Sequence, residues 1–260
     1  MKFSTTKILE IPVTCASVDS LVDNAISAIR AEGGEQIVFS CVNPHSIVES
    51  YANKLFFDAL NNAEHLVADG IGAYLALRLS GDYETPRITG SDYFTKLMSA
   101  LDSRGVKTKI AFFGSSEPVL NSIRKRFLRD YKNLEIAIMI SPPFGNWGDA
   151  ENQEMVDQLN TAMPDVIWVG MTAPKQECWS YRNRERLNAK FIGNIGAVFE
   201  FYAGTKPRAP EWACKFGVEW VYRWLQEPRR MWRRNLVSTP LFLWRFVTSL
   251  IFGPQSPKQA

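Results

Sequence analysis

The stretch TKIAFFGSSEPVLNSIRKRFLRDYKNLEIAIMI, residues 108–140, decides the fold class of this chain. Its two ends, 108–114 and 134–140, are short apolar runs of the kind that form buried strands. The segment between them, 116–130, has apolar residues at helical spacing and Pro118 close to its first turn. Those apolar residues are Val119, Leu120, Ile123 and Phe127. A strand, a helix and a second strand in this order predict a βαβ unit with parallel strands.

The same alternation runs along most of the chain. Further strand-like runs lie at 36–42, 65–68, 165–171 and 190–196. Helical patterns lie between the runs, for example over 17–33, where Gly33 is a suitable C-cap. We therefore predict an α/β fold, a parallel sheet with helices on both faces. The alternation ends near Ala203, and the remainder reads as helix without strands.

The charge of the chain changes at the same point. The 260 residues have a net charge of +3, yet residues 204–260 contain ten Lys/Arg and only three Asp/Glu. Five of the eight tryptophans also lie there. We expect a catalytic body over 1–203 and a C-terminal helical, Arg/Trp-rich appendage over 204–260 that meets an anionic partner.

Several features indicate a cytoplasmic protein. The N-terminus has no apolar region of a secretory signal, and the cysteines show no C-x-x-C spacing, as expected of thiols in a reducing compartment. The cysteines are Cys15, Cys41, Cys178 and Cys214. The longest apolar run, 236–252, is interrupted by Pro240 and Arg245. This run is better suited to a helix lying in a membrane interface than to one crossing the membrane.

Small and glycine-rich segments follow five of the predicted strands. Ligands of open α/β sheets bind at the carboxyl ends of the strands, where backbone N–H groups can approach a phosphate. The segments are NPHS (43–46), ADGIG (68–72), FFGSSE (112–117, with Gly114), VGMTAPKQE (169–177) and GNIGAVFEF (193–201). One such segment is weak evidence, but five together indicate a nucleotide-type ligand.

Five motifs in one order make the chain similar to a known family. ADGIG, RITGSDYF, APKQE, GAVFEFYAGTKPRAP and EWVYRWLQEPRRMWRR, within about Ile37 to Arg234, resemble the WecG/TagA/CpsF family of bacterial glycosyltransferases. The resemblance implies a Rossmann-like fold and an inverting, metal-independent transfer of a hexose from a UDP-sugar to a polyprenyl-diphosphate-linked sugar. Members act in cell-surface polysaccharide or exopolysaccharide assembly. A peripheral protein at the cytoplasmic face of the bacterial inner membrane is therefore expected, and a homo-oligomer is left open.

Asp69 is the candidate general base. An inverting transfer needs a group that takes the proton of the acceptor hydroxyl, and Asp69 lies at a strand end between Ala68 and Gly70. An aspartate before glycine more often caps the next helix, but the resemblance implies that this aspartate is the catalytic base. His45 is the alternative base, although a lone histidine is more often a packing or capping residue.

Five residues are candidates for substrate binding. Asn43 follows a strand and can bind a sugar hydroxyl, and the resemblance places Asn43 and Arg87 in the pocket. Gln176 is expected to contact the nucleotide from the start of a helix. Glu177 is equally suited to a structural role, and Gly114 ends a strand.

Positive charge on the C-terminal segment is expected to replace a metal ion. The chain has no D-x-D motif, and its two histidines lack ligand spacing, so we expect no metal and no cofactor. Arginine binds phosphate oxygens bidentately and can stabilise the departing UDP. The resemblance implies that Arg223, Arg230 and Arg233 close over the active site.

The rest of that segment is expected to meet the membrane. Pro228 is suited to the first turn of a new helix. Arg229 and Arg234, the tryptophans and the 236–252 run would then lie against anionic headgroups. A solvated basic helix would explain the charge but not the interleaved tryptophans.

Two departures from the family leave the donor sugar open. Phe199 is followed by Glu200 where the family commonly has aspartate, and Met171–Thr172–Ala173 replace a common Gly-Ser. N-acetylmannosamine and glucose both remain, and the departures together with the NPHS segment favour a plain hexose slightly.

Two other classes of protein would explain part of the sequence. An RNA-binding or RNA-modifying α/β protein would use the basic tail on phosphates, but the sequence has no recognisable RNA-binding signature, and we expect no nucleic-acid partner. A dinucleotide oxidoreductase would explain the alternation, but no G-x-G-x-x-G follows the first strand.

Overall fold

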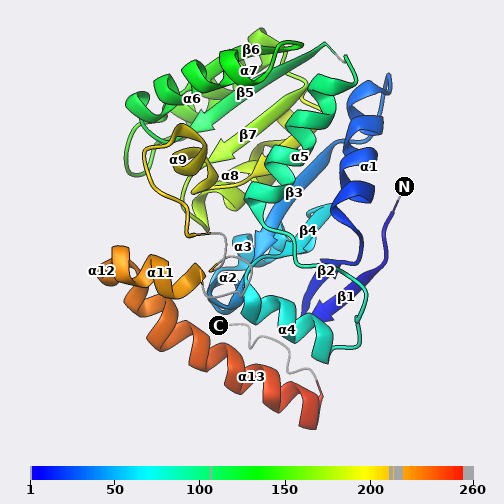
Figure 1. Cartoon of the computed structure of the whole chain (residues 1–260), viewed down its shortest axis with the longest axis vertical. Helices are drawn as coiled ribbons and strands as arrows, with labels where there is room; N and C mark the ends of the chain where they lie inside the picture. The colour runs from blue at the N-terminus through cyan, green and yellow to red at the C-terminus, as the bar shows by residue number, and fades with distance from the viewer. Residues whose placement is uncertain (1, 106, 211–212, 214–218, 254–260) are drawn as a thin grey trace. The chain divides into compact units, whose positions relative to one another are not determined.

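The computed structural model describes residues 2–105, 107–210, 213 and 219–253 of the chain (Figure 1). The chain forms two compact units. The first consists of Met1–Ser17, Cys41–Thr89 and Arg208–Ala260, and the second of Val18–Ser40 and Gly90–Pro207. The predicted boundary at 203/204 lies close to the point, after Pro207, where the chain leaves the second unit. A separate C-terminal appendage stays a prediction.

One six-stranded sheet contains the strands of the second unit together with residues 41–42 and 65–68, which belong to the first. The sheet has the order β4-β3-β8-β7-β5-β6, and the strands β3, β8, β7, β5 and β6 pair in parallel throughout. The strands are β3 (Ile37–Val42), β4 (His65–Ala68), β5 (Thr108–Gly114), β6 (Leu134–Ile140), β7 (Val166–Gly170) and β8 (Phe191–Asn194). All six lie where the apolar runs predicted strands, and the α/β fold is confirmed.

Helices cover both faces of this sheet (Figure 1). They are α1 (Val18–Arg30), α5 (Gly90–Ser103), α6 (Glu117–Asp130), α7 (Asp149–Ala162), α8 (Lys175–Asn183), the 3₁₀ turn η1 (Arg184–Arg186) and α9 (Val198–Ala203). Alternate residues of a strand face opposite sides. Phe113 of β5 stacks on Trp179 of α8, with ring centroids 4.1 Å apart. Its neighbour Phe112 meets Phe127 of α6 and Phe199 of α9 on the other side. Burial on both faces explains why the strands read as continuous apolar runs.

The first unit begins with a hairpin that the sequence did not reveal. Its elements before the C-terminal helices are β1 (Thr5–Ile8), β2 (Ile11–Thr14), α2 (Pro44–Ser50), α3 (Lys54–Asn61), β4 and α4 (Ile71–Leu79). The turn between β1 and β2 is made by Leu9 and Glu10, with Leu9 at φ 57°. Glycine, asparagine and aspartate are the usual residues at such an angle, so the turn has no signature in the sequence.

The hairpin lies beside strand β4. The buried hydroxyl of Thr14 accepts a hydrogen bond from the Leu66 N–H at 3.0 Å. The hairpin thus covers the outer edge of β4, whose backbone groups would otherwise be unpaired.

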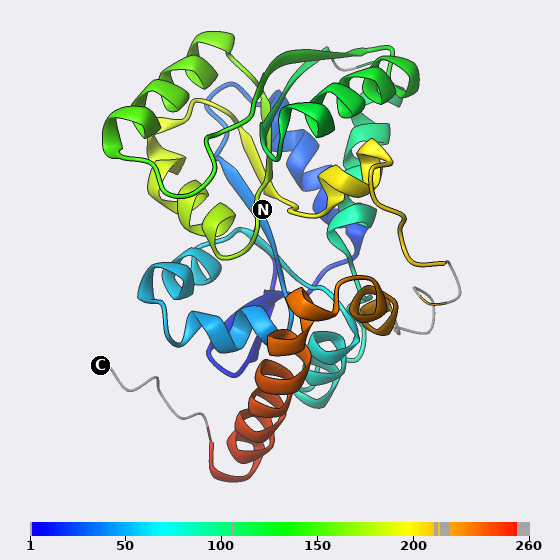
Figure 2. The same cartoon turned by 90° about the vertical axis from the view of Figure 1, so that its left-hand side faces the viewer.

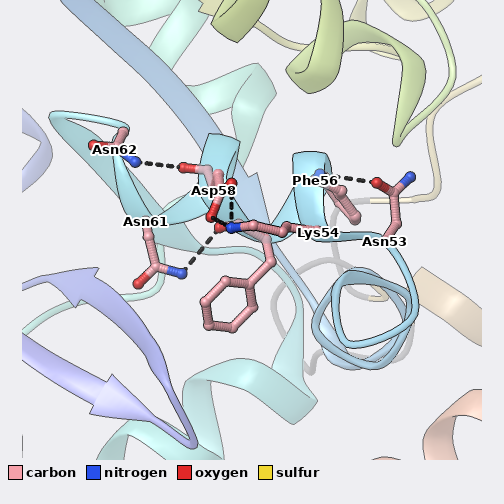
Figure 3. A network of polar contacts seen from close by, with 7 residues as sticks. Asn53, Lys54, Phe56, Asp58, Asn61 and Asn62 are labelled. Carbon is pink, nitrogen blue, oxygen red and sulfur yellow. Dashed lines mark hydrogen bonds and ion pairs between the residues drawn. The ribbon is translucent and has the colours of Figure 1, made fainter. Parts of the chain in front are cut away.

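Helix α3 is fixed by side chains at both ends (Figure 3). The side chain of Asn53 accepts from the Phe56 N–H at its start, and the side chain of Asn62 donates to the Asp58 carbonyl at its end. Lys54 and Asp58 form an ion pair of 2.9 Å one turn apart. These caps satisfy groups that a short helix leaves unpaired.

The C-terminal helices follow one another with little interruption (Figure 2). They are α11 (Glu219–Gln226), α12 (Pro228–Arg233), the π-helical turn η2 (Arg234–Ser238) and α13 (Thr239–Phe252). The predicted helix start at Pro228 is confirmed. Phe242 and Phe246 of α13 are buried and Trp244 is exposed, so the helix has an inner and an outer face.

Candidate functional site

Asn43 and Asp69 lie at the ends of neighbouring strands in the first unit. Asn43 directly follows β3, and Asp69 directly follows β4. The two strand ends are joined, because the Asp69 N–H donates to the Val42 carbonyl at 2.8 Å. The fold thus brings together the predicted base and the predicted sugar-binding amide at the carboxyl edge, where such sheets bind ligands.

The side chain of Asn43 is held by helix α2. Its oxygen accepts hydrogen bonds from the His45 N–H at 3.1 Å and the Ser46 N–H at 3.2 Å. The Ser46 hydroxyl in turn accepts from the Asn43 N–H at 2.8 Å, which completes a capping box. Among the described residues, none accepts a hydrogen bond from the Asn43 amide nitrogen, so its two N–H groups can bind a sugar hydroxyl.

Asp69 is not the N-cap of the helix that follows it. Helix α4 is capped by Gly70, at φ 82°, with no side-chain cap bond. A Cβ at Gly72 would lie 2.6 Å from Cγ of Pro44, so α4 and α2 approach closely only because residue 72 is glycine. Asp69 is half-buried between these two helix starts. The common capping role of an Asp-Gly pair therefore does not account for this aspartate.

Arg87 lies half-buried in the loop between α4 and α5. Arg78 donates to the carbonyls of Asp82 and Thr85 and so anchors this loop to α4. Burial would raise the pKa of Asp82, but hydrogen bonds from Cys15, Thr85 and the Glu84 backbone outweigh it and hold the pKa at about 2. A fixed carboxylate thus shapes the loop that positions Arg87.

In the second unit, the ends of β5 and β7 approach closely. Gly114 pairs with Gly170 and has φ 123°. A Cβ at Gly114 would lie 2.5 Å from the Gly170 carbonyl oxygen. Ser115, next along the chain, also has positive φ, and its carbonyl accepts a hydrogen bond from the Ser141 hydroxyl at 2.9 Å. The ends of β5 and β6 are thereby tied into one edge.

Gln176 and Glu177 are both buried in the first turn of α8. The Gln176 carbonyl oxygen accepts from the Met171 N–H at 3.3 Å, and its amide nitrogen donates to Glu177 at 2.8 Å. Burial raises the pKa of Glu177 to about 7, against the hydrogen bond from Gln176, which lowers it. The two side chains thus brace the loop after β7. Direct contact of either with a nucleotide stays a prediction.

Asn194 at the end of β8 is a polar residue that the sequence analysis missed. It accepts from the Ser180 hydroxyl at 2.7 Å and donates to the Ser40 hydroxyl at 2.9 Å, and all three side chains are buried. Asn194 lies in the GNIG segment, whose glycines indicate a backbone that can approach a phosphate and do not indicate a role for the amide side chain. A fully paired buried network of this kind fixes β3, β8 and α8 in place.

The loop after β6 is attached to the start of α8. Lys175 donates to the Gly145 carbonyl, and its ammonium lies 3.5 Å from the ring centroid of Trp147. Partial burial lowers the pKa of Lys175. Phe144 at the tip of this loop is almost fully exposed, at 94%.

The C-terminal arginines lie on the helices as predicted, but their side chains are only partly described. Those of Arg223 and Arg230 lie outside the described residues. Arg233 is exposed, and its guanidinium lies 3.5 Å from Glu49 of α2. A contact of Arg223, Arg230 or Arg233 with a diphosphate stays a prediction.

Among the residues that the structure describes, no three or more His, Cys, Asp or Glu side chains are grouped so that they could hold a metal ion. Metal independence remains a prediction. The polar groups of the first unit suit proton abstraction from a hydroxyl, and the glycine-rich strand ends of the second suit a phosphate-bearing ligand.

Comparison with known proteins confirms the resemblance of the motifs. The model of the family described as "Glycosyl transferase WecG/TagA/CpsF family" matches residues 6–256. A similar curated protein is the N-acetylglucosaminyldiphosphoundecaprenol N-acetyl-beta-D-mannosaminyltransferase of Bacillus spizizenii, which is 29% identical over 80% of this chain and 76% of the relative.

Two proteins with the same name show how widely the similarity extends. That of Bacillus subtilis is 27% identical over 76% of this chain and 75% of its own length. That of Staphylococcus aureus strain MW2 is 24% identical over 86% of this chain and 85% of its own length. The similarity therefore covers both units.

Proposed function

Because this chain belongs to the WecG/TagA/CpsF family of glycosyltransferases, we propose that it moves a hexose from a UDP-sugar to a polyprenyl-diphosphate-linked sugar. The transfer inverts the anomeric carbon, needs no metal ion and serves cell-surface polysaccharide or exopolysaccharide assembly. The relatives' names support the acceptor, since they act on N-acetylglucosaminyldiphosphoundecaprenol. The observation that carries the proposal is Asp69 beside Asn43 at two joined strand ends.

Asp69 is the general base in this proposal. It takes the proton of the acceptor hydroxyl while that oxygen attacks the anomeric carbon and UDP leaves from the opposite face. Asn43, fixed by its capping bonds, orients a sugar hydroxyl next to it. Arg87 binds in the same pocket.

The departing diphosphate is stabilised by arginine. Arg223, Arg230 and Arg233 supply the positive charge that other glycosyltransferases obtain from a metal ion, because preorganised donors can contribute several kcal/mol to a charged transition state. Excess EDTA should accordingly leave transfer nearly unchanged, and activity restored only by Mg²⁺ or Mn²⁺ would contradict this part.

The donor is N-acetylmannosamine or glucose. The relatives' names favour the first. The second is favoured by the departures from the family: Met171–Thr172–Ala173 follow β7, and Glu200 is paired with Lys206 at 2.9 Å. A panel of UDP-sugars with a short-chain polyprenyl-diphosphate N-acetylglucosamine acceptor decides between them.

A peripheral position on the cytoplasmic membrane surface completes the proposal. Met231–Phe252 is the one helical stretch, within the residues described, that is long and apolar enough to cross a membrane. Its inner face is occupied, because Phe242 and Phe246 are buried. The outer face is apolar and suits an interfacial position. Its exposed residues include Leu236, Leu243, Trp244, Val247, Leu250 and Ile251.

The central test is the variant Asp69→Asn. We expect turnover to fall by about 10²–10⁴, as when a general base is removed, with UDP affinity unchanged within a few-fold. Asp58→Asn is the matched control, because that carboxylate pairs with Lys54 on α3. An Asp69→Asn protein that keeps more than about a tenth of the wild-type rate would refute the role of Asp69.

Ligand binding distinguishes a glycosyltransferase from the two alternatives, an oxidoreductase and an RNA-binding protein. A thermal shift with UDP is expected, and none with NAD or RNA. A chain that is stabilised by NAD or RNA and transfers no sugar from any UDP donor would overturn the proposed function.

A further inference from the structure

Helix α2 and its C-cap meet the C-terminal helices through three side-chain contacts among the residues described. The imidazole Nδ1 of His45 lies 2.8 Å from the hydroxyl of Ser238. The Glu49 carboxylate lies 3.5 Å from Arg233. The guanidinium of Arg245 stacks over the ring of Tyr51, the C-cap of α2, 4.8 Å from its centroid. Residues of α12, η2 and α13 thus all meet the same seven-residue helix.

Ser238 is the most buried member of these contacts. It is 1% exposed, whereas the side chain of Arg233 is 65% exposed. A buried hydroxyl without a partner costs stability, whereas an exposed ion pair contributes little. Losing the contact between His45 and Ser238 should therefore cost more stability than losing the ion pair of Glu49 and Arg233.

His45 also touches the candidate site through its backbone. Its N–H donates to the side-chain oxygen of Asn43, so one residue binds the predicted sugar-binding amide and the C-terminal segment together. Ser238 lies at the end of the π-helical turn η2, a kind of irregularity that is frequent at functional positions in helices.

We propose that His45 is a positioning residue, whose contact with Ser238 holds the C-terminal helices on α2 at a fixed place relative to Asn43. The proposal rests on the proposed role of the C-terminal arginines in transfer. It gives the histidine a role other than that of the alternative base, and it accounts for the burial of Ser238 in the C-terminal helices.

Two independent measurements test the proposal. Amide hydrogen exchange over 239–252, taken without substrate, reports the docking of α13, because an undocked helix of this length is only marginally stable in water. Steady-state kinetics with a short, water-soluble acceptor report transfer without any membrane.

The variants are chosen as a cycle with a matched control. His45→Ala and Ser238→Ala each remove one partner, and the double variant removes both. Ser249→Ala is the control, since its hydroxyl bonds only the Phe246 carbonyl of its own helix. His45→Asn is the rescue, because an asparagine amide can place a polar atom near the position of Nδ1.

We expect His45→Ala and Ser238→Ala to raise exchange over 239–252 about tenfold and to lower kcat about as much, with KM for the UDP-sugar within about twofold. The double variant should be no worse than either single one. Ser249→Ala should match the wild type, and His45→Asn should recover most of the loss.

Unchanged exchange in both alanine variants overturns the proposal, and so does faster exchange with an unaffected kcat. Exchange is measured without turnover, so a wild-type chain that transfers no sugar refutes the proposed function and not the docking contact.

Discussion

Glu177 is a carboxyl group buried without full pairing. It is 3% exposed, and among the described residues its Oε2 has no hydrogen-bond partner. Burial raises its pKa from 4.5 to about 7, so the folded chain binds a proton that the unfolded chain releases. Its contribution to stability is fully present below about pH 4.5 and is lost as the pH rises through about 7.

The variant Glu177→Gln should remove this dependence, because an amide does not titrate. Between pH 5 and pH 8 the wild type should lose up to about 3 kcal/mol of unfolding free energy relative to the variant. Urea denaturation of both proteins across this range measures the difference, in which all other titrating groups cancel. Parallel pH profiles would show that Glu177 is ionised in the fold.

At position 114 the backbone has room for glycine but for no residue with a Cβ atom. Gly114→Ala combines a positive φ with a Cβ 2.5 Å from a backbone carbonyl that cannot move aside. Gly145→Ala is the control, since Gly145 also has positive φ but nothing within 4 Å of its Cβ position. We expect a loss of about 1–2 kcal/mol for the control and clearly more for Gly114→Ala, measured by chemical denaturation. Equal losses would mean that the ends of β5 and β7 can separate at little cost.

At the scale of elements, the sequence predicted the parallel strands and several helices, because both kinds of element follow apolar periodicity. The β1–β2 hairpin escaped because Leu9 and Glu10 form its turn without a turn-forming residue. The π-helical turn escaped because the same residues fit an ordinary helix.

Helix α13 has a buried face and an exposed face, and we expect the exposed face to bind the membrane. Trp244→Ala should weaken binding to anionic vesicles by several-fold and leave transfer to a water-soluble acceptor unchanged, because Trp244 is 62% exposed. Vesicle sedimentation at two salt concentrations measures the effect, and Thr248→Ala on the same helix is the control, since that hydroxyl bonds its own helix. A Trp244→Ala protein that sediments like the wild type would place the membrane contact elsewhere.

At the scale of the whole molecule, the sequence placed the candidate residues at strand ends but did not predict their hydrogen-bond partners. Asp69 and Asn43 were expected together because neighbouring strands end at one edge. The sequence could not pair Ser238 with His45, since the two are 193 positions apart. It also could not show that the side chain of Gln176 hydrogen-bonds to Met171 and Glu177, because those bonds depend on the path of the loop in the folded chain.

A chain ending after Pro207 tests what the C-terminal segment adds to the whole. Every strand that the structure describes precedes that point, so the sheet should form, as measured by circular dichroism. Transfer to a soluble acceptor should fall below detection, because Arg223, Arg230 and Arg233, the proposed charges on the leaving diphosphate, would be missing. Full-length activity in the shortened chain would show that the segment is an anchor alone.

The π-helical turn also sets the rotational phase of everything after it. Each residue of an α-helix turns the chain by about 100° about the axis. The five residues Arg234–Ser238 turn the chain by about as much as four α-helical residues, because a π-turn closes over one residue more. If the same five residues adopted an ordinary α-helix, α13 would therefore rotate by about 100°. Arg245 would then turn away from the Tyr51 ring, Phe242 and Phe246 would leave their buried positions, and part of the outer face would turn inward. The additional residue in η2 thus determines which face of α13 is buried and which is exposed.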